Sequence, residues 1–549
     1  MNRFAALLDR LSYEPRRNAK IALMAEYFRE TPDPARGLAL AALTGDLDFR
    51  HAKPGIIRAL IAERTDPVLF GLSYDYVGDL SETVALMWPA ETVDNDDSPD
   101  ISLPEIVRAF ETAGRAELPG LLATLLDRLD ETGRWAVLKL ITGGLRVGVS
   151  ARLAKTAVAA LGDLEPKDVE EVWHGLEPPY EALFAWAEGT GGKPANTDPA
   201  PFRPPMLSHA VEETDFEKLD AAACAAEWKW DGIRVQAVAT TDTDGRPARR
   251  LYSRTGDDIS AAFPDLLAAL DFDAAVDGEL LVVRDDRVMS FNTLQQRLNR
   301  KKVTEKMMRD FPAHLIAYDL LVEAGDDLRA LPFSERRTRL EALGSGLESD
   351  RITLSPLVPF DTWDDLTAAR ADPETHGAGA DAAAVEGVMI KRLESPYLAG
   401  RPKGHWYKWK RDPFNVDAVL MYAQRGHGKR SSFYSDYTFG VWRRGASENA
   451  DGDELVPVGK AYFGFTDEEL RRLDRFVRQN TVNRFGPVRE VTHEPGAGLV
   501  LEIAFEGLAR STRHKSGLAM RFPRVARIRW DKTPADADRI EMLEALLRD

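Results

Sequence analysis

Hydrophobic residues in the first 190 positions recur at intervals of three or four, which is the spacing of amphipathic helices. Leu7, Leu8 and Leu11 begin this pattern, and the leucines between 121 and 129 repeat it. Turn-forming residues at 31–34 divide the region into segments. The spacing predicts an all-α domain over residues 1–190.

The pattern changes after a stretch rich in Gly and Pro, so residues 191–204 are predicted to be a linker. Short apolar runs then alternate with helical segments, one of which is expected to contain Cys224. These features predict an α/β domain at 205–412. Its clearest expected strands lie at 235–239, 275–283 and 384–391.

The last part of the chain is predicted to be mostly β. Strand-like runs at 416–422, 437–442 and 499–505 surround one amphipathic helix at 467–477. The third predicted domain therefore spans residues 413–549.

Composition fits several soluble domains but gives an ambiguous signal about partners. The chain has 549 residues, of which 44% are hydrophobic and 29% charged. A net charge of −17 argues at first against a polyanionic partner. The basic residues are unevenly spread, however: residues 391–411 hold seven Lys or Arg against one acidic residue, and residues 506–532 hold eight against two. We therefore expect local, salt-sensitive binding of any nucleic acid.

The single cysteine, Cys224, excludes an intramolecular disulfide and any Cys-rich zinc site within the chain. The N-terminus lacks the apolar core of a signal peptide, and no apolar run approaches a membrane span. These features predict a soluble, cytoplasmic protein.

The strongest local signal is the K-x-D-G sequence that begins at Lys229. Such a sequence occurs by chance in about one chain in ten of this length, and alone it indicates only a strand end with a tight turn. Six further segments follow it in order, and each alone could be an ordinary strand. They include Ser253–Gly256, Val276–Leu280, Ala317–Leu321, Glu386–Lys391, Trp406–Lys410 and, as the last block, Arg521–Lys532.

Together these segments resemble the collinear motifs of the covalent nucleotidyltransferases, and most closely those of the ATP-dependent DNA ligases. The resemblance covers residues 205–535 and implies an α/β, ATP-grasp-like adenylyltransferase domain followed by an OB-fold β-barrel. The helical region resembles the DNA-binding domain of the larger ligases, most clearly at Leu140–Leu153. Length and N-terminus resemble the bacterial ligases of the cisplatin damage response.

The resemblance implies that Lys229 attacks the α-phosphate of ATP, carries AMP as a lysyl adduct and releases pyrophosphate. Nearby cations and desolvation favour the neutral amine that such an attack requires. Glu227 is expected to read the adenine amino group and Tyr318 to stack on the base. The other nucleotide-binding residues that it implies are Arg234, Arg254, Glu279, Lys408, Lys410, Arg521, Arg524 and Lys532, with Asp531 beside the last of them.

Hard carboxylate ligands for Mg²⁺ (or Mn²⁺) are expected from Glu279 and Glu386, together with Asp231. The resemblance implies contacts with nicked duplex DNA from Arg146, Arg152, Arg297 and Arg300. The last two belong to the basic segment 291–302, which fits a DNA-facing helix, or equally a solvated basic helix. AMP would pass to the 5′-phosphate of the nick, and the 3′-hydroxyl would then displace it.

Two other functions compete with nick sealing in DNA repair or replication. An RNA ligase or an mRNA-capping guanylyltransferase shares K-x-D-G, but capping enzymes lack a helical domain before the catalytic core. A non-catalytic nucleic-acid-binding protein would lack a key residue, whereas Lys229, Glu279, Glu386 and Lys408 are all present. NAD-dependent ligases need a four-cysteine zinc site, which a chain with the single cysteine Cys224 cannot form. We therefore predict an ATP-dependent monomer without membrane contacts, in a bacterial cytoplasm at the nucleoid.

Overall fold

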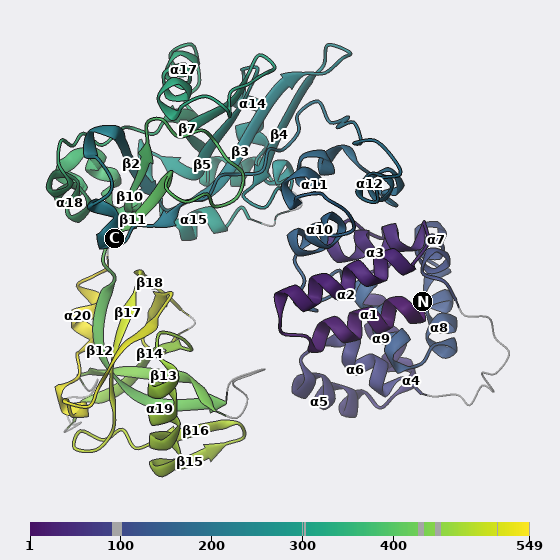
Figure 1. Ribbon diagram of the computed structural model, residues 1–549. Helices are drawn as coiled ribbons and strands as arrows, with labels where there is room; N and C mark the ends of the chain where they lie inside the picture. The colour runs from purple at the N-terminus through teal and green to yellow at the C-terminus, as the bar shows by residue number, and fades with distance from the viewer. Residues whose placement is uncertain are drawn as a thin grey trace. The chain divides into compact units, whose positions relative to one another are not determined.

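The computed structural model of the protein describes residues 1–89, 101–298, 300, 303–425, 433–444, 452–512 and 514–547 (Figure 1). It divides into two compact units, Met1–Trp409 and Lys410–Asp549. Within the described residues, no helix is both long enough and apolar enough to cross a membrane.

The beginning of the first unit is helical, as the three-to-four spacing predicts. Polar N-caps such as Asp66, Ser102 and Ser150 accept hydrogen bonds from the first turn of their helices. The helices are α1 (Asn2–Tyr13), α2 (Arg17–Glu30), α3 (Ala35–Thr44), α4 (Pro54–Arg64), α5 (Pro67–Val77), α6 (Leu80–Met87), α7 (Leu103–Thr112), α8 (Leu118–Arg128), α9 (Glu131–Thr142), α10 (Ala151–Ala159), α11 (Pro166–Val172) and α12 (Glu181–Ala187).

The rest of the first unit contains two sheets. One has the order β4-β3-β5-β7-β8, with β6 on β5 and β9 on β7, and the other has the order β1-β11-β10-β2. Near-continuous apolar sequence in β5 and β7 reflects burial on both faces. The strands are β1 (His209–Ala210), β2 (Cys224–Trp230), β3 (Ile233–Thr241), β4 (Pro247–Ser253), β5 (Ala274–Arg284), β6 (Arg287–Val288), β7 (Ala313–Glu323), β8 (Asp326–Asp327), β9 (Ile352–Leu354), β10 (Val385–Arg392) and β11 (Trp406–Lys410).

Short helices connect these strands, and two details differ from the sequence predictions. Cys224 begins β2 rather than lying in a helix. The predicted helix at 291–302 is only α15 (Phe291–Gln295) in the described residues, while 299, 301 and 302 lie outside them. The other helices here are α13 (Glu213–Phe216), α14 (Pro264–Ala269), α16 (Glu305–Asp310), α17 (Phe333–Ser345) and α18 (Trp363–Ala371).

The second unit is rich in β-structure, as predicted. Its main sheet has the order β14-β13-β12-β16-β15, and β17 pairs with both β12 and β20. A capping box of Thr466 and Glu469 begins the predicted amphipathic helix. The elements are β12 (Phe414–Arg425), β13 (Tyr434–Arg443), β14 (Glu454–Ala461), α19 (Asp467–Gln479), β15 (Thr481–Phe485), β16 (Val488–Val491), β17 (Val500–Phe505), β18 (Gly507–Arg510), β19 (Leu518–Arg521), β20 (Arg524–Arg529) and α20 (Ile540–Glu544).

Candidate active site

Lys229 lies near the end of β2, and its amine hydrogen-bonds to the carboxylate of Glu386. The two side chains are 21% and 24% exposed, so the pair is open enough for a substrate to reach. β2 pairs with β10 in antiparallel register, and a bulge between Val385 and Val388 interrupts the pairing. Gly387, inside this bulge, has a φ of +142°, which side-chain-bearing residues rarely adopt. The bulge therefore explains how Glu386 meets Lys229.

The glycines of two motifs permit close approach of neighbouring strands. A Cβ atom at Gly232 would lie 2.6 Å from the Leu280 carbonyl oxygen, and one at Gly278 would lie 2.6 Å from a Leu315 methyl group. Neither position accepts a side chain without movement of its neighbours. Because β3 and β5 pair in this way, Arg234 lies directly opposite Glu279 in the sheet.

Glu279 is surrounded by charged groups that the sequence assigned to the same site. Burial raises the pKa of Glu279 to about 8, and the positive charges of Lys229 and Arg234 oppose this increase. The carboxylates of Glu386 and Asp231 add to it. The structure therefore brings the three predicted metal ligands and the predicted nucleophile within electrostatic reach of one another.

Arg234 is held in place by the neighbouring strand β5, by the segment between β10 and β11, and by the segment before β1. Its guanidinium donates to Asp277 at 2.5 Å, to the Tyr397 hydroxyl at 3.0 Å and to the Met206 carbonyl at 2.6 Å. Among the described residues its buried Nε has no hydrogen-bond partner. The pKa of Arg254 is lowered by burial and by the positive charge of Arg234. This concentration of positive charge suits a polyphosphate.

The predicted base-reading residue, Glu227, is buried, and both of its carboxylate oxygens have cationic partners. Lys391 Nζ lies 2.6 Å from Oε2, and Arg337 Nη1 lies 3.1 Å from Oε1. The Lys391 amine also lies 4.7 Å from the centre of the Tyr318 ring. Sequence reasoning missed both cations: Lys391 ends a recognised motif, whereas Arg337 belongs to none.

Lys408 lies on β11, whose alternating pattern places Trp406, Lys408 and Lys410 on one face of the strand. The Trp406 ring is 4.5 Å from the amine of Lys391, so this face of β11 is directed toward the base-reading residues. On the opposite face, Trp409 packs against Phe216 in the core.

In the second unit, carboxylates hold several predicted nucleotide-binding cations. Glu506 lies 2.8 Å from Lys410 and 3.5 Å from Arg524, and Asp417 pairs with Lys532. The guanidinium of Arg529 is 3.1 Å from Asp417 and 2.7 Å from Asp531. Arg521 lies over the ring of the exposed Phe522. The second unit therefore gathers Lys410, Arg524 and Lys532 into two carboxylate-linked groups.

The structure separates the four predicted DNA-binding arginines. Arg146 is 75% exposed, and Arg152 is 57% exposed beside Glu170. Arg300 is exposed as well. The predicted DNA contact of Arg297 is wrong, because its side chain is fully buried and lies 2.6 Å from Asp265. It also donates to the Ala262 and Phe311 carbonyls. Arg297 therefore stabilises the core and cannot reach DNA.

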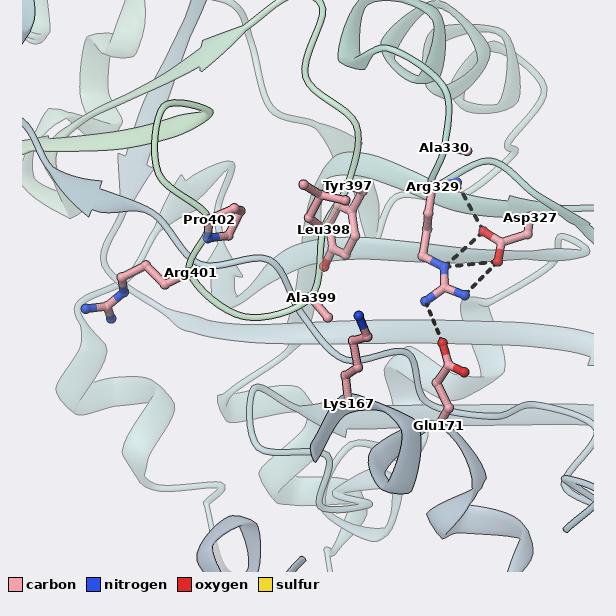
Figure 2. A pocket seen from close by; sticks show the side chains of 10 residues that line it. All are labelled: Lys167, Glu171, Asp327, Arg329, Ala330, Tyr397, Leu398, Ala399, Arg401 and Pro402. Atoms are coloured by element: carbon pink, nitrogen blue, oxygen red, sulfur yellow. Dashed lines mark hydrogen bonds and ion pairs between the residues drawn. The ribbon is translucent and has the colours of Figure 1, made fainter. Parts of the chain in front are cut away.

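The first unit contains a cavity of about 780 Å³ between α11 and the segment 397–402, and Figure 2 shows the side chains that line it. At one side of it, Arg329 pairs with the neighbouring Asp327 at 2.6 Å and with Glu171 of α11 at 3.7 Å. Tyr397, which contacts Arg234, is the cavity's connection to the predicted site. The remaining lining residues are Lys167, Ala330, Leu398, Ala399, Arg401 and Pro402.

Comparison with known proteins decides among the competing readings. The family described as ATP dependent DNA ligase domain matches residues 205–410, and the ATP dependent DNA ligase C terminal region matches residues 430–532. A probable DNA ligase of Koribacter versatilis (strain Ellin345) is 32% identical over 579 residues, covering 100% of this chain and 96% of that protein. The chain belongs to the ATP-dependent DNA ligase family. The resemblance seen in the motifs is thereby confirmed.

Two further comparisons cover most of the ligase. DNA ligase 1 of Korarchaeum cryptofilum (strain OPF8) is 30% identical over 81% of this chain and 79% of its own length. A solved structure named Pmar-Lig_Pre aligns with 96% of this chain and 99% of its own, at a TM-score of 0.54 and 16% identity. The latter supports a shared fold alone.

The raised pKa of Glu279 predicts that a Glu279→Gln ligase gains stability relative to wild type as the pH rises. Between the ordinary pKa of 4.5 and about 8, the unfolded chain ionises Glu279 while the folded protein keeps its proton. Wild type therefore loses stability over this interval, and glutamine does not. The difference in unfolding free energy should grow by roughly 2–4 kcal/mol between pH 5 and pH 8.5. Thermal melts without metal or nucleotide measure it; a difference independent of pH contradicts the assignment.

Proposed function

We propose that the ligase seals nicks with a 5′-phosphate and a 3′-hydroxyl in duplex DNA, using ATP (EC 6.5.1.1). The observation that carries the proposal is the contact of Lys229 with Glu386, beside Glu279 and Arg234, inside the matched ligase domain. A nucleophilic amine, carboxylates and phosphate-binding guanidinium groups are the groups that adenylyl transfer requires.

In the first step, the Lys229 amine attacks the α-phosphorus of ATP. A P–N bond forms, the bond to the β-phosphate oxygen breaks, and pyrophosphate leaves. Lys229 must give up a proton for this attack. The carboxylate of Glu386, which is in contact with the amine, accepts this proton. Lys408 lies on the strand face directed toward the base site, from which it contacts the α-phosphate. Arg521, Arg524 and Lys532 orient the pyrophosphate.

The residues present fit a divalent cation that is shared with the substrate. Glu279, Glu386 and Asp231 offer hard oxygen ligands, but no group of three or more His, Cys, Asp or Glu in the described part of the chain forms a preformed cluster. Mg²⁺ usually takes one or two carboxylates and completes its shell with water and substrate phosphates. When bound, it would neutralise charge on the transferring phosphate.

In the next two steps, Arg234 and Arg254 bind the 5′-phosphate of the nick and align it with lysyl-AMP. A phosphate oxygen attacks the AMP phosphorus and Lys229 leaves, which gives an adenylated DNA end. The 3′-hydroxyl then attacks the 5′-phosphorus, AMP departs and the strand is continuous. The guanidinium pair contributes mainly by positioning and by neutralising charge.

The proposal also includes the domain boundaries and the fold of each domain. The helical residues 1–190 would bind DNA, 191–204 would link them to an ATP-grasp-like domain at 205–412, and 413–549 would be an OB-fold. The two sheets of the first unit and the seven-stranded sheet of the second support the coarser description, an α/β domain followed by a β-rich one. We expect a monomer in the bacterial cytoplasm, where ATP and nicked DNA occur together. Membership of the cisplatin-damage-response group stays a prediction.

Substitution of Arg146 and Arg152 by alanine should weaken binding of nicked duplex DNA by about tenfold and lower the slope of log K against log salt by about 2. Both side chains are more than half exposed, and Arg146 has a φ of +53°. The matched control is the exposed pair Arg108 and Arg115, whose replacement makes the same change in net charge. Equal effects of both double variants would contradict a localised contact.

Sealing of a labelled nicked duplex tests the proposed function, with ATP, GTP or NAD supplied in separate reactions. We expect sealing in the reaction that contains ATP and Mg²⁺, and no sealing in the reactions with GTP or NAD. Preference for a nicked RNA strand would favour the RNA ligase alternative, and labelling by GTP without sealing would favour a capping enzyme.

A further inference from the structure

The carboxylate of Glu227 is clamped between two cations from different elements. Lys391, on β10, lies 2.6 Å from Oε2, and Arg337, on α17, lies 3.1 Å from Oε1. Both Glu227 and Lys391 are 2% exposed at their side chains, and Arg337 is 10% exposed. Because each cation binds a different oxygen, the clamp fixes the plane of the carboxylate as well as its position.

Lys391 joins this carboxylate to the predicted base-stacking residue. Its amine donates to the Tyr318 carbonyl at 3.2 Å and lies 4.7 Å from the centre of the Tyr318 ring. The rings of Phe333 and Trp406 lie 4.7 Å and 4.5 Å from the same amine. Its position is therefore set by aromatic faces on several sides.

Arg337 completes the clamp from outside the recognised motifs. Its Nε donates to Glu341 at 2.7 Å, one helical turn further along α17, so its two ends contact different carboxylates. Burial raises the pKa of Glu227, and Lys391 and then Arg337 oppose that increase, while the nearby Asp319 adds to it. Loss of Arg337 would leave a buried carboxylate with one cation and one unpartnered oxygen.

We propose that Arg337 is a positioning residue for base selection, which holds Glu227 as an oriented carboxylate that accepts a hydrogen bond from the adenine amino group. The inference rests on the proposed function, because it requires ATP as the substrate of Lys229. Adenine presents an amino donor where guanine presents a carbonyl acceptor. A fixed carboxylate accepts from the first and repels the second. A mobile carboxylate can turn away from the guanine carbonyl, and a protonated carboxyl group can donate a hydrogen bond to it.

The test measures adenylylation of Lys229 by full-length Arg337→Gln, Arg337→Lys and wild-type ligase, with α-labelled ATP or GTP. For Arg337→Gln we expect KM for ATP to increase about tenfold and kcat to change less than about threefold, because Arg337 contacts no reacting atom. The ratio of kcat/KM for ATP to that for GTP should fall at least about tenfold. Arg337→Lys should restore most of this ratio.

Arg339→Gln is the matched control, since Arg339 lies on the same helix but pairs with Glu323 and Glu335 instead. It should leave the ATP-to-GTP ratio unchanged. A folded Arg337→Gln protein with wild-type selectivity would overturn the inference, as would equal losses of selectivity in both variants. If Arg337→Gln does not fold, Arg337→Met takes its place as a second variant without the charge, and a folded Arg337→Met protein with wild-type KM and selectivity would overturn the proposal. Absence of ATP labelling in wild type would instead reject the proposed function.

Discussion

A Lys229→Ala ligase is expected to lose self-adenylylation by ATP by at least about 10⁴-fold, because no other amine can take the place of the attacking group. Lys229 is the lysine in contact with Glu386, and Glu279 lies within electrostatic reach. Incubation with α-labelled ATP and Mg²⁺, followed by denaturing electrophoresis, measures the covalent label. Sealing of nicks that already carry AMP should fall far less, since that step forms no bond to Lys229.

Lys229→Arg is the matched control for this prediction. It retains the positive charge opposite Glu386, but a guanidinium does not lose its proton at working pH and cannot act as the nucleophile. It should therefore be as inactive in labelling as the alanine variant while keeping more of the fold's stability. Substantial labelling of either variant would place the covalent AMP elsewhere.

Replacement of Lys532 by alanine should reduce self-adenylylation by about 10²-fold, yet change sealing of pre-adenylated nicks by less than about threefold. Lys532 pairs with Asp417 in the second unit, together with Arg529. Its proposed task, orienting the pyrophosphate, exists only in the first step. Single-turnover assays on ATP and on pre-adenylated DNA separate the two effects.

Lys515→Ala provides the control in the same unit. Lys515 is 67% exposed and pairs with Glu454 at 3.0 Å, so its loss removes the same charge from a surface site. It should leave both steps unchanged. If Lys532→Ala slows the two steps equally, Lys532 serves DNA binding or the fold rather than pyrophosphate orientation.

The sequence predicts most of the fold because its two periodicities are strong. Spacings of three and four identify the helical region, and the apolar runs at 235–239 and 275–283 fall inside β3 and β5. Cys224 is placed wrongly because Ala-rich sequence before a strand resembles a helix. A short buried strand gives no clear period of its own.

The sequence predicts only those residues of the candidate site that belong to a local motif. The glycines of K-x-D-G and D-G-E are needed because β3, β5 and β7 lie too close together for a side chain at these positions. The motifs contain these glycines, but the sequence alone does not reveal the contact that requires them. The sequence predicts a DNA contact for Arg297 because the basic composition of segment 291–302 does not reveal that this one side chain is buried against Asp265. Arg337 gave no signal, since its contact with Glu227 spans more than a hundred residues.

A pulse of α-labelled ATP, followed by a chase with unlabelled ATP and nicked duplex DNA, tests whether AMP passes from Lys229 to the nick. The label should appear first on a peptide containing Lys229, then on the 5′-end of the nick, and finally as free AMP as the strand is sealed. Sealing without a labelled protein intermediate, or a protein label that never passes to the nick, would contradict this transfer.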